Sequence, residues 1–379
     1  MVTSPANTEL VWVDKPEHLK IVADELATQD VLAVDTESNS LYAYQEQVCL
    51  LQFSTLTKDY LIDAVVLGDL SPLATVFRSE RILKVFHAAE YDLICLFRDF
   101  GFHFSFLFDT MIAARTLGYQ KIGLGALLEH FFNLHINKKY QRANWGRRPL
   151  KQEMIDYARV DSHFLIPLQH RLKRELKNAG RWELALEDFR RLPLGVEDTT
   201  ESCTKDFWKL NGACDLTPRQ AAVLKSLYLF RESRAKAQNT PPFKVIGHKT
   251  LVELAQAIPE TINELKKCPT VSKRIIEKYG EGLIHAVKQG EKEPPECPPH
   301  HPRPEDAVLE RMDALREWRK SYGHSLNVPS DVILPRDVLN RIAWQNPKNL
   351  NELALPMEDV PYRFQRFGPD IIKTLKIGV

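Results

Sequence analysis

The sequence predicts an α/β domain at the N-terminal end, followed by two small all-helical domains. Short apolar runs with strand character lie within residues 31–87, and helix-period stretches begin to alternate with them. From Asp109 onward the apolar spacing is almost entirely helical, and two C-terminal blocks share one order of helices and loops. Strands, then strand–helix alternation, then helices are typical of such an arrangement. A chain of 379 residues also exceeds what one hydrophobic core usually supports.

The elements of the first domain follow from apolar periodicity. Two strand-like runs, 47–55 and 59–64, flank a short polar turn and predict a hairpin. Asp109 is placed to cap the helix that follows it. The remaining expected elements are strands at 31–35 and 81–87 and helices at 69–78, 88–100 and 151–178.

The rest of the chain divides by composition. The predicted parts are the first domain at 1–192, a connector at 193–216, a helical domain at 217–290, an extended linker at 291–305 and a second helical domain at 306–379. The linker holds six prolines, which cannot continue a helix. Residues 229–265 and 315–353 match in order, which indicates a tandem duplication. The alternative is that any two helical bundles share such patterning.

Charge is distributed unevenly although the formal net charge is only +1. Acidic residues outnumber basic ones in 1–190, whereas 217–290 hold 13 Lys and Arg against 6 Asp and Glu. An acidic half beside a basic module suits an enzyme that holds metal ions and meets phosphate. The six cysteines form no C-x-x-C pair, and no signal peptide or membrane-length apolar run is apparent. We therefore expect a cytoplasmic protein without membrane contact, acting as a monomer.

Acidic residues at three separated places carry the chemistry. Asp35 and Glu37 alternate on a strand, so both carboxylates face one way. Asp92 opens a helix after a strand, and Tyr157 and Asp161 lie one turn apart on a later helix. Each has an ordinary explanation alone: a solvated strand end, a helix-start acid or a polar stripe. Together they meet the needs of phosphodiester hydrolysis by two divalent metal ions, which take carboxylate and water oxygens.

These residues stand in motifs that resemble the ribonuclease D family of DEDD exonucleases. The motifs are AVDTES…VCLLQFS (33–54), VFHAAEYDL (85–93) and YARVDSHFLIPL (157–168), with DTMIAARTLGY and WGRRPL between the last two. The resemblance implies a ribonuclease-H-like exonuclease domain, a mixed sheet with flanking helices. It also implies that the helical domains are HRDC-like nucleic-acid-binding modules. The implied ligands of two Mg²⁺ or Mn²⁺ ions are Asp35, Glu37, Asp92 and Asp161, and Tyr157 would position the nucleophilic water.

Several further residues are expected to face the substrate. Basic and aromatic side chains are interleaved in residues 138–151, which suits single-stranded RNA. The alternative there is a solvated loop whose tryptophan packs on the core. The family's aromatic after the glutamate is absent, so Leu41 or Tyr42 is a candidate wedge against the terminal base. The expected RNA contacts are Leu41, Tyr42, His87, Lys138, Lys139, Tyr140, Arg142, Trp145, Arg147, Arg148, Arg231, Arg234 and Lys236.

The predicted activity is hydrolysis from the 3′ end of RNA, releasing nucleoside 5′-monophosphates. The resemblance implies tRNA precursors and other structured small RNAs with free 3′ ends as substrates. One alternative is a 3′-5′ DNA exonuclease of the proofreading or Werner type, since the acids alone do not distinguish the sugars. Another is an RNA-binding adaptor that has lost activity, although all four acids and the tyrosine are present.

Overall fold

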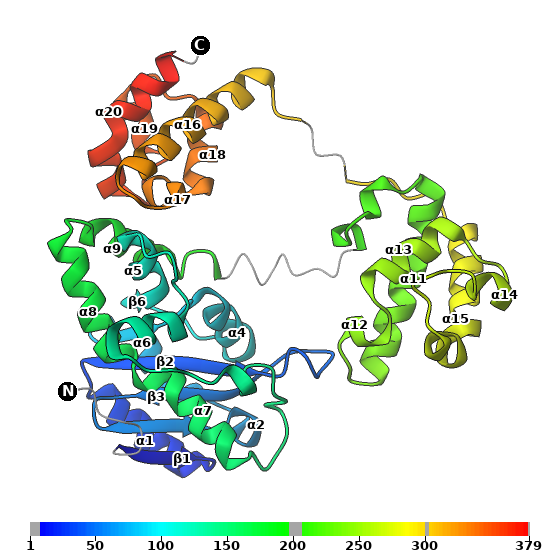
Figure 1. Ribbon diagram of the computed structural model, residues 1–379, viewed down its shortest axis with the longest axis horizontal. Coiled ribbons are helices and arrows are strands. Elements are labelled where there is room, and N and C mark those ends of the chain that lie inside the picture. Colours follow the sequence, from blue (N-terminus) through cyan, green and yellow to red (C-terminus); the bar gives the residue numbers. More distant parts are fainter. Residues whose placement is uncertain (1–7, 197–206, 300–302, 378–379) are drawn as a thin grey trace. The chain divides into compact units, whose positions relative to one another are not determined.

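The computed structural model describes residues 8–196, 207–299 and 303–377. The predicted connector 193–216 and linker 291–305 therefore lie partly outside the described residues, as does Cys203. The chain forms two compact units (Figure 1). The first contains 8–37, 48–196 and 303–377, and the second contains 38–47 and 207–299. The five-part division made from the sequence stays a prediction.

The first unit is built on a six-stranded mixed sheet with the order β1-β4-β3-β2-β5-β6. Its strands are β1 (Glu9–Val13), β2 (Val31–Ser38), β3 (Val48–Ser54), β4 (Lys58–Ile62), β5 (Leu83–Phe86) and β6 (Leu107–Asp109). Strands β3 and β4 form the predicted antiparallel hairpin. The pairs β1–β4, β2–β5 and β5–β6 are parallel.

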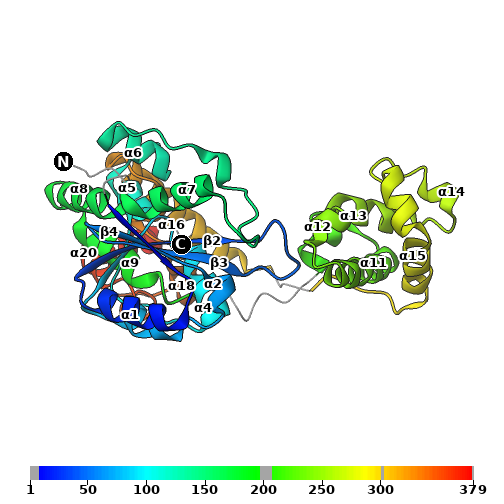
Figure 2. The ribbon, with the colours of Figure 1, turned by 90° about the horizontal axis from the view of Figure 1, so that it is seen from below.

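Helices cover both faces of this sheet (Figure 2). They are α1 (Pro16–Ala27), α2 (Ala64–Leu67), α3 (Ala74–Arg78), α4 (Glu90–Phe100), α5 (Thr110–Leu117), α6 (Leu124–Phe132), α7 (Gln152–His163), α8 (Leu165–Asn178) and α9 (Trp182–Arg191). Helices α1, α3 and α4 share a hydrophobic cluster with one face, while α5, α6, α8 and α9 pack on the other. Helix α7 lies over β3 and β4.

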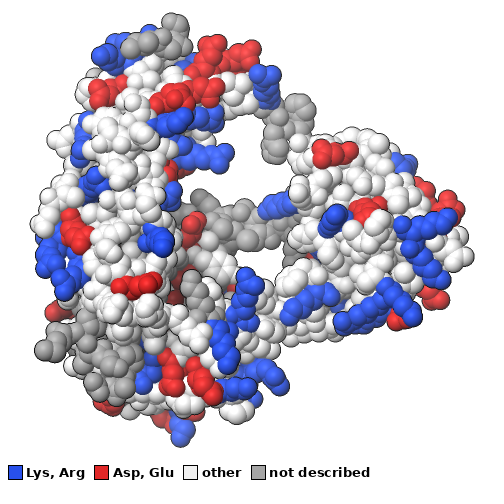
Figure 3. Space-filling view, viewed as in Figure 1, with Lys and Arg blue, Asp and Glu red and all other residues white. Residues whose placement is uncertain are grey.

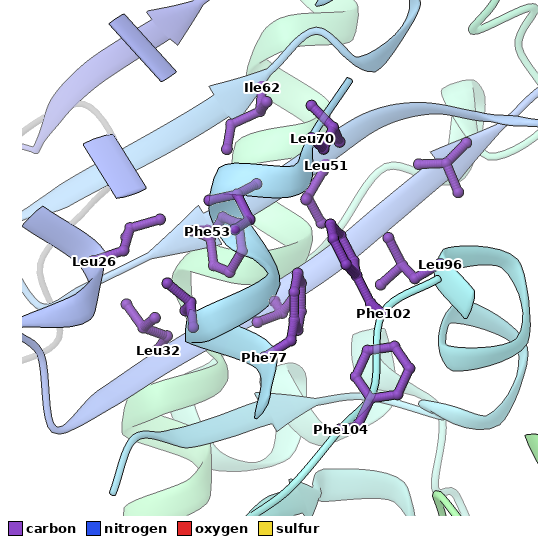
Figure 4. Close-up of a cluster of buried hydrophobic side chains, with 14 of the residues drawn as sticks. Leu26, Leu32, Leu51, Phe53, Ile62, Leu70, Phe77, Leu96, Phe102 and Phe104 are labelled. Atoms are coloured by element: carbon purple, nitrogen blue, oxygen red, sulfur yellow. The ribbon is translucent and has the colours of Figure 1, made fainter. Parts of the chain in front are cut away.

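The core on the α1–α4 side is rich in aromatic rings (Figure 4). Phe77 lies at its centre, with ring centroids 4.9 Å from Phe102, 5.5 Å from Phe104 and 5.6 Å from Phe53. Offset and edge-on arrangements at such separations add to the stabilisation from burial alone. The same cluster holds α4 against β2.

The predicted fold class is confirmed, with differences in detail. Strands β1 and β6 and helices α1 and α2 were not expected from the sequence, because they are short or lack strong apolar periodicity. The helix expected over 151–178 is interrupted at Phe164, where α7 ends and α8 begins. Pro167 explains the interruption, because proline has no N–H to donate to the carbonyl of residue 163 and its ring clashes there. As predicted, Asp109 caps α5, accepting hydrogen bonds from the backbone N–H groups of Met111 and Ile112.

The second unit is a helical bundle made of α11 (Pro218–Ala237), α12 (Pro242–Val245), α13 (His248–Ala257), α14 (Ile262–Leu265) and α15 (Lys273–Lys292). Thr217 and Gln220 form a capping box at the start of α11. The segment Ser38–Gln47 packs with this bundle: the Tyr44 hydroxyl lies 3.1 Å from Glu232 Oε2, and its backbone N–H donates to Asn239 Oδ1 at 3.2 Å.

Residues 306–377 repeat this bundle within the first unit. The helices are α16 (Asp306–Ser325), α17 (Ser330–Ile333), α18 (Arg336–Gln345), α19 (Leu350–Ala354) and α20 (Pro361–Ile377). Their order of long, short, long, short and long helices reproduces that of α11 to α15, with 20 residues in both α11 and α16. The expectation of two HRDC-like bundles is therefore confirmed.

The repeated bundle is joined to the α/β domain by a buried ionic contact. The fully buried guanidinium of Arg363 on α20 lies 2.9 Å from carboxylate oxygens of both Glu187 and Asp188 on α9. Arg191 extends the contact with pairs to Asp359 at 2.8 Å and Asp337 at 2.5 Å. A buried charge without its partner is strongly destabilising, so this contact ties the two elements together.

No helix within the described ranges combines the length and apolar character needed to cross a lipid bilayer.

Candidate active site

The strand alternation of β2 sorts its side chains onto the two faces of the sheet. Leu32 and Val34 belong to the cluster on the α1–α4 side, whereas Ala33 belongs to the cluster on the α5–α8 side. Because strand side chains alternate, Asp35 and Glu37 continue the face of Ala33. Both carboxylates are half-buried at the end of this strand.

Helix α7 brings the last two predicted residues to the same place. Ala158 packs against Leu50 of β3, and Tyr157 and Asp161 occupy positions one helical turn apart. Carboxylate oxygens of Asp35, Glu37 and Asp161 all lie within 4.8 Å of one another. Three of the four predicted acids therefore converge tightly.

Asp92 borders this group from a different direction. It lies in the first turn of α4 and accepts a short hydrogen bond from the Thr36 hydroxyl. Thr36 follows Val34 on the opposite face of β2 from Asp35, which is the side of α4. Burial, and after it the charge of Asp92, raises the pKa of Asp35. Asp92 is thus held by a hydroxyl, and its carboxylate is not among the three that lie within 4.8 Å of one another.

Crowding and burial make the metal-free carboxylates hard to ionise. Burial, followed by the charges of neighbouring acids, raises the pKa of Asp35 and of Glu37 well above the ordinary range. Burial raises the pKa of Asp92 to about 7 against the hydrogen bond from Thr36. Burial also raises the pKa of Asp161 to about 7, opposed by a hydrogen bond from Tyr157. Carboxylates this close to one another repel each other unless a cation neutralises them.

The donor set fits hard divalent cations. It offers carboxylate oxygens and no sulfur or nitrogen ligand among the three clustered residues, which is the preference of Mg²⁺ and Mn²⁺. Gln52 on β3 is fully buried, and neither of its amide atoms has a hydrogen-bond partner within the described residues. Its strand neighbours Leu50 and Ser54 both contact α7, so the amide belongs to the same face. Buried amides of this kind are normally satisfied by water or an ion.

A buried polar network fixes α7 on the sheet. Asp59 of β4 is fully buried, and its carboxylate lies 3.0 Å from Arg159 Nη2 and 3.0 Å from His163 Nδ1. Ser54 donates to the same carboxylate at 2.7 Å and also lies 2.8 Å from the Ser162 hydroxyl. Burial alone would raise the pKa of Asp59, but the hydrogen bonds with His163, Ser54 and Thr8 outweigh it and lower the pKa. The network sets the rotation of the helix that carries Tyr157 and Asp161.

Asp109 does more than the predicted capping. Besides the α5 N-terminus, its carboxylate accepts from the backbone N–H groups of Ala88 at 3.2 Å and Ala89 at 2.7 Å. These residues directly precede α4, and Ala88 has a φ of 62°, which is rare outside glycine. Asp109 therefore positions the helix that carries Asp92. The sequence showed the cap, but only the fold reveals the second contact.

The prediction that Trp145 stacks on RNA needs correction. Its ring is 1 % exposed and packs in the cluster under α7, 6.2 Å from the centroid of Tyr157. Arg148 is also structural: it forms a two-point ion pair with the buried Asp63, with both N–O distances 2.5 Å. Trp145 thus packs on the core, as the alternative interpretation of this loop held, and its ring contacts Tyr157. Tyr140 contributes a second ring at 6.1 Å.

Arg231 needs correction as well. It is 2 % exposed and lies 3.0 Å from Glu232, so its guanidinium belongs to the interior of the helical unit. The periodicity of α11 did not show this, because nonpolar and basic residues alternate around the helix. Arg234 and Lys236, on the same helix, are exposed.

The other expected RNA contacts keep the status of predictions. Lys139, Arg142 and Arg147 are exposed, and the Lys139 ammonium lies 5.3 Å from the Tyr140 ring centroid. The side chain of Lys138 lies outside the described residues. His87 Nδ1 is 2.9 Å from the Thr110 hydroxyl, and burial lowers the pKa of His87.

Leu41 and Tyr42 belong to the second unit. They are 36 % and 37 % exposed, and the Lys244 ammonium lies 4.2 Å from the Tyr42 ring centroid. Their contact with the terminal base stays a prediction.

The chain is also similar to known proteins. A family model for 3′-5′ exonucleases matches residues 10–177, and the HRDC domain model matches residues 220–287 and 308–375. The chain is 30% identical over 297 residues to Protein RRP6-like 2 of Arabidopsis thaliana, covering 74% of this chain and 34% of that protein. It spans about a third of the length of the first curated relatives that it matches.

Two further matches cover a larger share of the similar protein's own chain. Ribonuclease D of Acidiphilium cryptum is 28% identical over 385 residues, with 98% of this chain and 95% of that protein covered. The crystal structure of the catalytic core of RRP6 from Trypanosoma brucei is 31% identical, covers 76% of this chain and 81% of that one, and has a TM-score of 0.64. The chain therefore belongs to the 3′-5′ exonuclease family, in the branch that joins this domain to HRDC domains and includes ribonuclease D.

Proposed function

We propose that the protein is a metal-dependent 3′-5′ exoribonuclease that releases nucleoside 5′-monophosphates one at a time. One observation carries the proposal: carboxylate oxygens from β2 and α7 lie within 4.8 Å of one another, with a tyrosine one turn away on α7. Ribonuclease D and RRP6 are named among the proteins that this chain resembles, which supports RNA as the substrate class.

Asp35, Glu37, Asp92 and Asp161 would hold two divalent ions, Mg²⁺ or Mn²⁺. Such ions, when bound, supply a nucleophile from water at neutral pH and stabilise charge on the attacking and leaving oxygens. The chain's own contribution is to hold the acids ready. Thr36 orients Asp92, and the Asp59 network fixes the helix that carries Asp161.

Tyr157 would orient the attacking water. Burial, and then the charge of Asp161, raises the pKa of Tyr157 above its ordinary value, so the phenol keeps its proton at neutral pH. A protonated phenol cannot act as a general base, but it can hold a water molecule through its oxygen or its O–H. Its hydrogen bond with Asp161 and the packing of Trp145 and Tyr140 restrict the ring to one orientation.

The biological substrates we propose are tRNA precursors and other structured small RNAs with free 3′ ends. Arg142 and Arg147, exposed near Tyr140, would position phosphates of the strand. We also propose that the protein works as a monomer in the cytoplasm, where the free thiols of Cys49, Cys95 and Cys268 would persist.

The test uses RNA and DNA of matched sequence, labelled at the 5′ end, with Mg²⁺ or with a chelator. A ladder of single-nucleotide steps on RNA, lost with chelator, is the expected result. Asp161→Asn should abolish cleavage while RNA binding persists. Asp156→Asn is the matched control, because Asp156 lies exposed on the same helix. Internal cuts, faster cleavage of DNA, or full activity of Asp161→Asn would refute the assignment.

A further inference from the structure

A small pocket on the second unit combines aromatic rings with cations. It has a volume of about 250 Å³ and lies between the C-terminal half of α11 and the middle of α15. Its lining residues are Phe230, Arg234, Gln238, Lys278, Tyr279 and Gly282. The lining contains no acidic residue, unlike the pocket lined by Glu260, Glu281 and His285 on the same unit.

Each ring in the pocket is paired with a cation. The Arg234 guanidinium carbon lies 5.2 Å from the Phe230 centroid, and the Lys278 ammonium lies 5.0 Å from the Tyr279 centroid. The rings meet edge to face, with centroids 6.4 Å apart and an interplanar angle of 84°. Arg234 and Lys278 are exposed, while both rings are half-buried. The two cations therefore face solvent, and each lies close to a ring that packing holds in place.

Gln238 organises the polar side of the pocket. Its Oε1 accepts from Lys278 Nζ at 2.8 Å and lies 3.1 Å from the Tyr279 hydroxyl. Since an ammonium can only donate, the amide oxygen must face it, and the amide NH₂ is left to donate to a ligand. Lys278 and Gln238, with the charge of Arg274, lower the pKa of Tyr279 although burial of the phenol opposes them. The pocket therefore lies in a positive field.

We propose that this pocket binds one nucleotide of single-stranded RNA, with the base against Phe230 and Tyr279 and the phosphate beside Arg234 and Lys278. The inference extends the proposed exoribonuclease function and rests on it for the identity of the strand. Rings that stack on bases and cations that track the backbone are what single-stranded nucleic acid requires. The unit also carries the chain's excess of basic residues, and Figure 3 shows Lys and Arg side chains along its lower side.

A substitution at Gly282 tests the pocket without removing any side chain that lines it. A Cβ at this position would lie 2.6 Å from Cε2 of Phe230, so the ring must move. Gly282→Ala should therefore disturb the stacking surface while every cation stays in place. Phe230→Ala removes the ring outright, and Arg234→Gln removes one exposed charge without touching the core.

Binding is measured with the full chain carrying Asp161→Asn, using fluorescent single-stranded RNA and an abasic strand of equal length. Phe230→Ala and Gly282→Ala should each weaken binding to RNA about tenfold and abolish the preference over the abasic strand. Arg234→Gln should weaken binding to both strands and reduce the salt dependence by about 0.7 in log–log slope. Phe243→Ala and Lys267→Gln are the matched controls, since both side chains are exposed on the same unit outside the pocket.

Affinity equal to the parent for Phe230→Ala and Gly282→Ala, with folding verified by circular dichroism, would overturn the inference. So would equal binding of RNA and abasic strands by the parent. Failure of the proposed function looks different: the chain with Asp161 intact would then not shorten a di- or trinucleotide in Mg²⁺. Phe243→Ala and Lys267→Gln with Asp161 intact should degrade such short substrates at the parental rate, because both side chains lie outside the pocket.

Discussion

Ionisation of Asp161 should destabilise the metal-free protein, and Asp161→Asn should relieve that cost. Burial raises the pKa of this carboxyl from 3.8 to about 7. A folded-state pKa above the unfolded one favours the protonated form, so the stabilisation is complete below pH 3.8. It is lost progressively as the pH rises through about 7. Asparagine stays neutral and does not show this loss.

The expected magnitude follows from the pKa difference. Each pKa unit corresponds to about 1.4 kcal/mol, so full ionisation costs about 4 kcal/mol at most. Asp161 is half-buried and shares its charge with Asp35 and Glu37, so we expect about 2–4 kcal/mol at pH 8. For a domain of this size, 1 kcal/mol shifts the Tm by about 2–4 °C. Asp161→Asn should therefore raise the Tm of the chelator-treated protein by at least about 4 °C at pH 8.

The assay is thermal unfolding followed by circular dichroism, at pH 5 and pH 8, with chelator or with Mg²⁺. The difference between variant and parent should grow from pH 5 to pH 8 and shrink when Mg²⁺ stabilises the parent. Asp156→Asn, exposed on the same helix, should leave the Tm unchanged in all four conditions. An Asp161→Asn protein less stable than the parent at pH 8 in chelator would refute the electrostatic argument.

Three other variants test separate parts of the structure. Tyr157→Phe should lower kcat roughly 10²-fold with KM unchanged, because only the orientation of water is lost; a parental kcat would contradict that role. Arg363→Met should cost about 3–5 kcal/mol by leaving the buried Glu187 and the half-buried Asp188 without their partner, whereas the exposed Arg366→Met should not; equal unfolding midpoints would show that the contact is dispensable. Trp145→Phe should cost about 1–2 kcal/mol of stability yet keep single-stranded RNA affinity in the Asp161→Asn background, and a clear loss of affinity would restore the stacking role.

Local patterns were sufficient for much of the candidate site. The alternation of Asp35 and Glu37 on a strand and the one-turn spacing of Tyr157 and Asp161 are short-range features, and the structure reproduces both. The hairpin of β3 and β4 and the cap at Asp109 are equally local. The duplicated bundles were visible because each repeat preserves its own order of helices.

The contacts that orient these residues were not visible, since each joins positions far apart in the chain. Asp59 reaches Arg159 and His163 about a hundred residues later. Arg148 and Trp145 look like RNA-facing residues in a basic loop, because periodicity says nothing about which loop side chains are buried. The two residues of a buried ion pair such as Arg148–Asp63 lie in distant segments, and the sequence of either segment alone does not reveal the pair.

The sequence by itself determined the acidic residues available for metal binding, the order of elements and the repeated helical modules, because these depend on residue type and short spacing. Only the tertiary structure decided that Asp92 is held by Thr36 from the other face of β2. Only the tertiary structure also shows that Arg231 and Arg363 are buried against carboxylates, whereas Arg234 and Lys278 line a surface pocket. The physical reason is that the burial of a charge is set by the elements packed around it, which residue spacing along the chain does not specify.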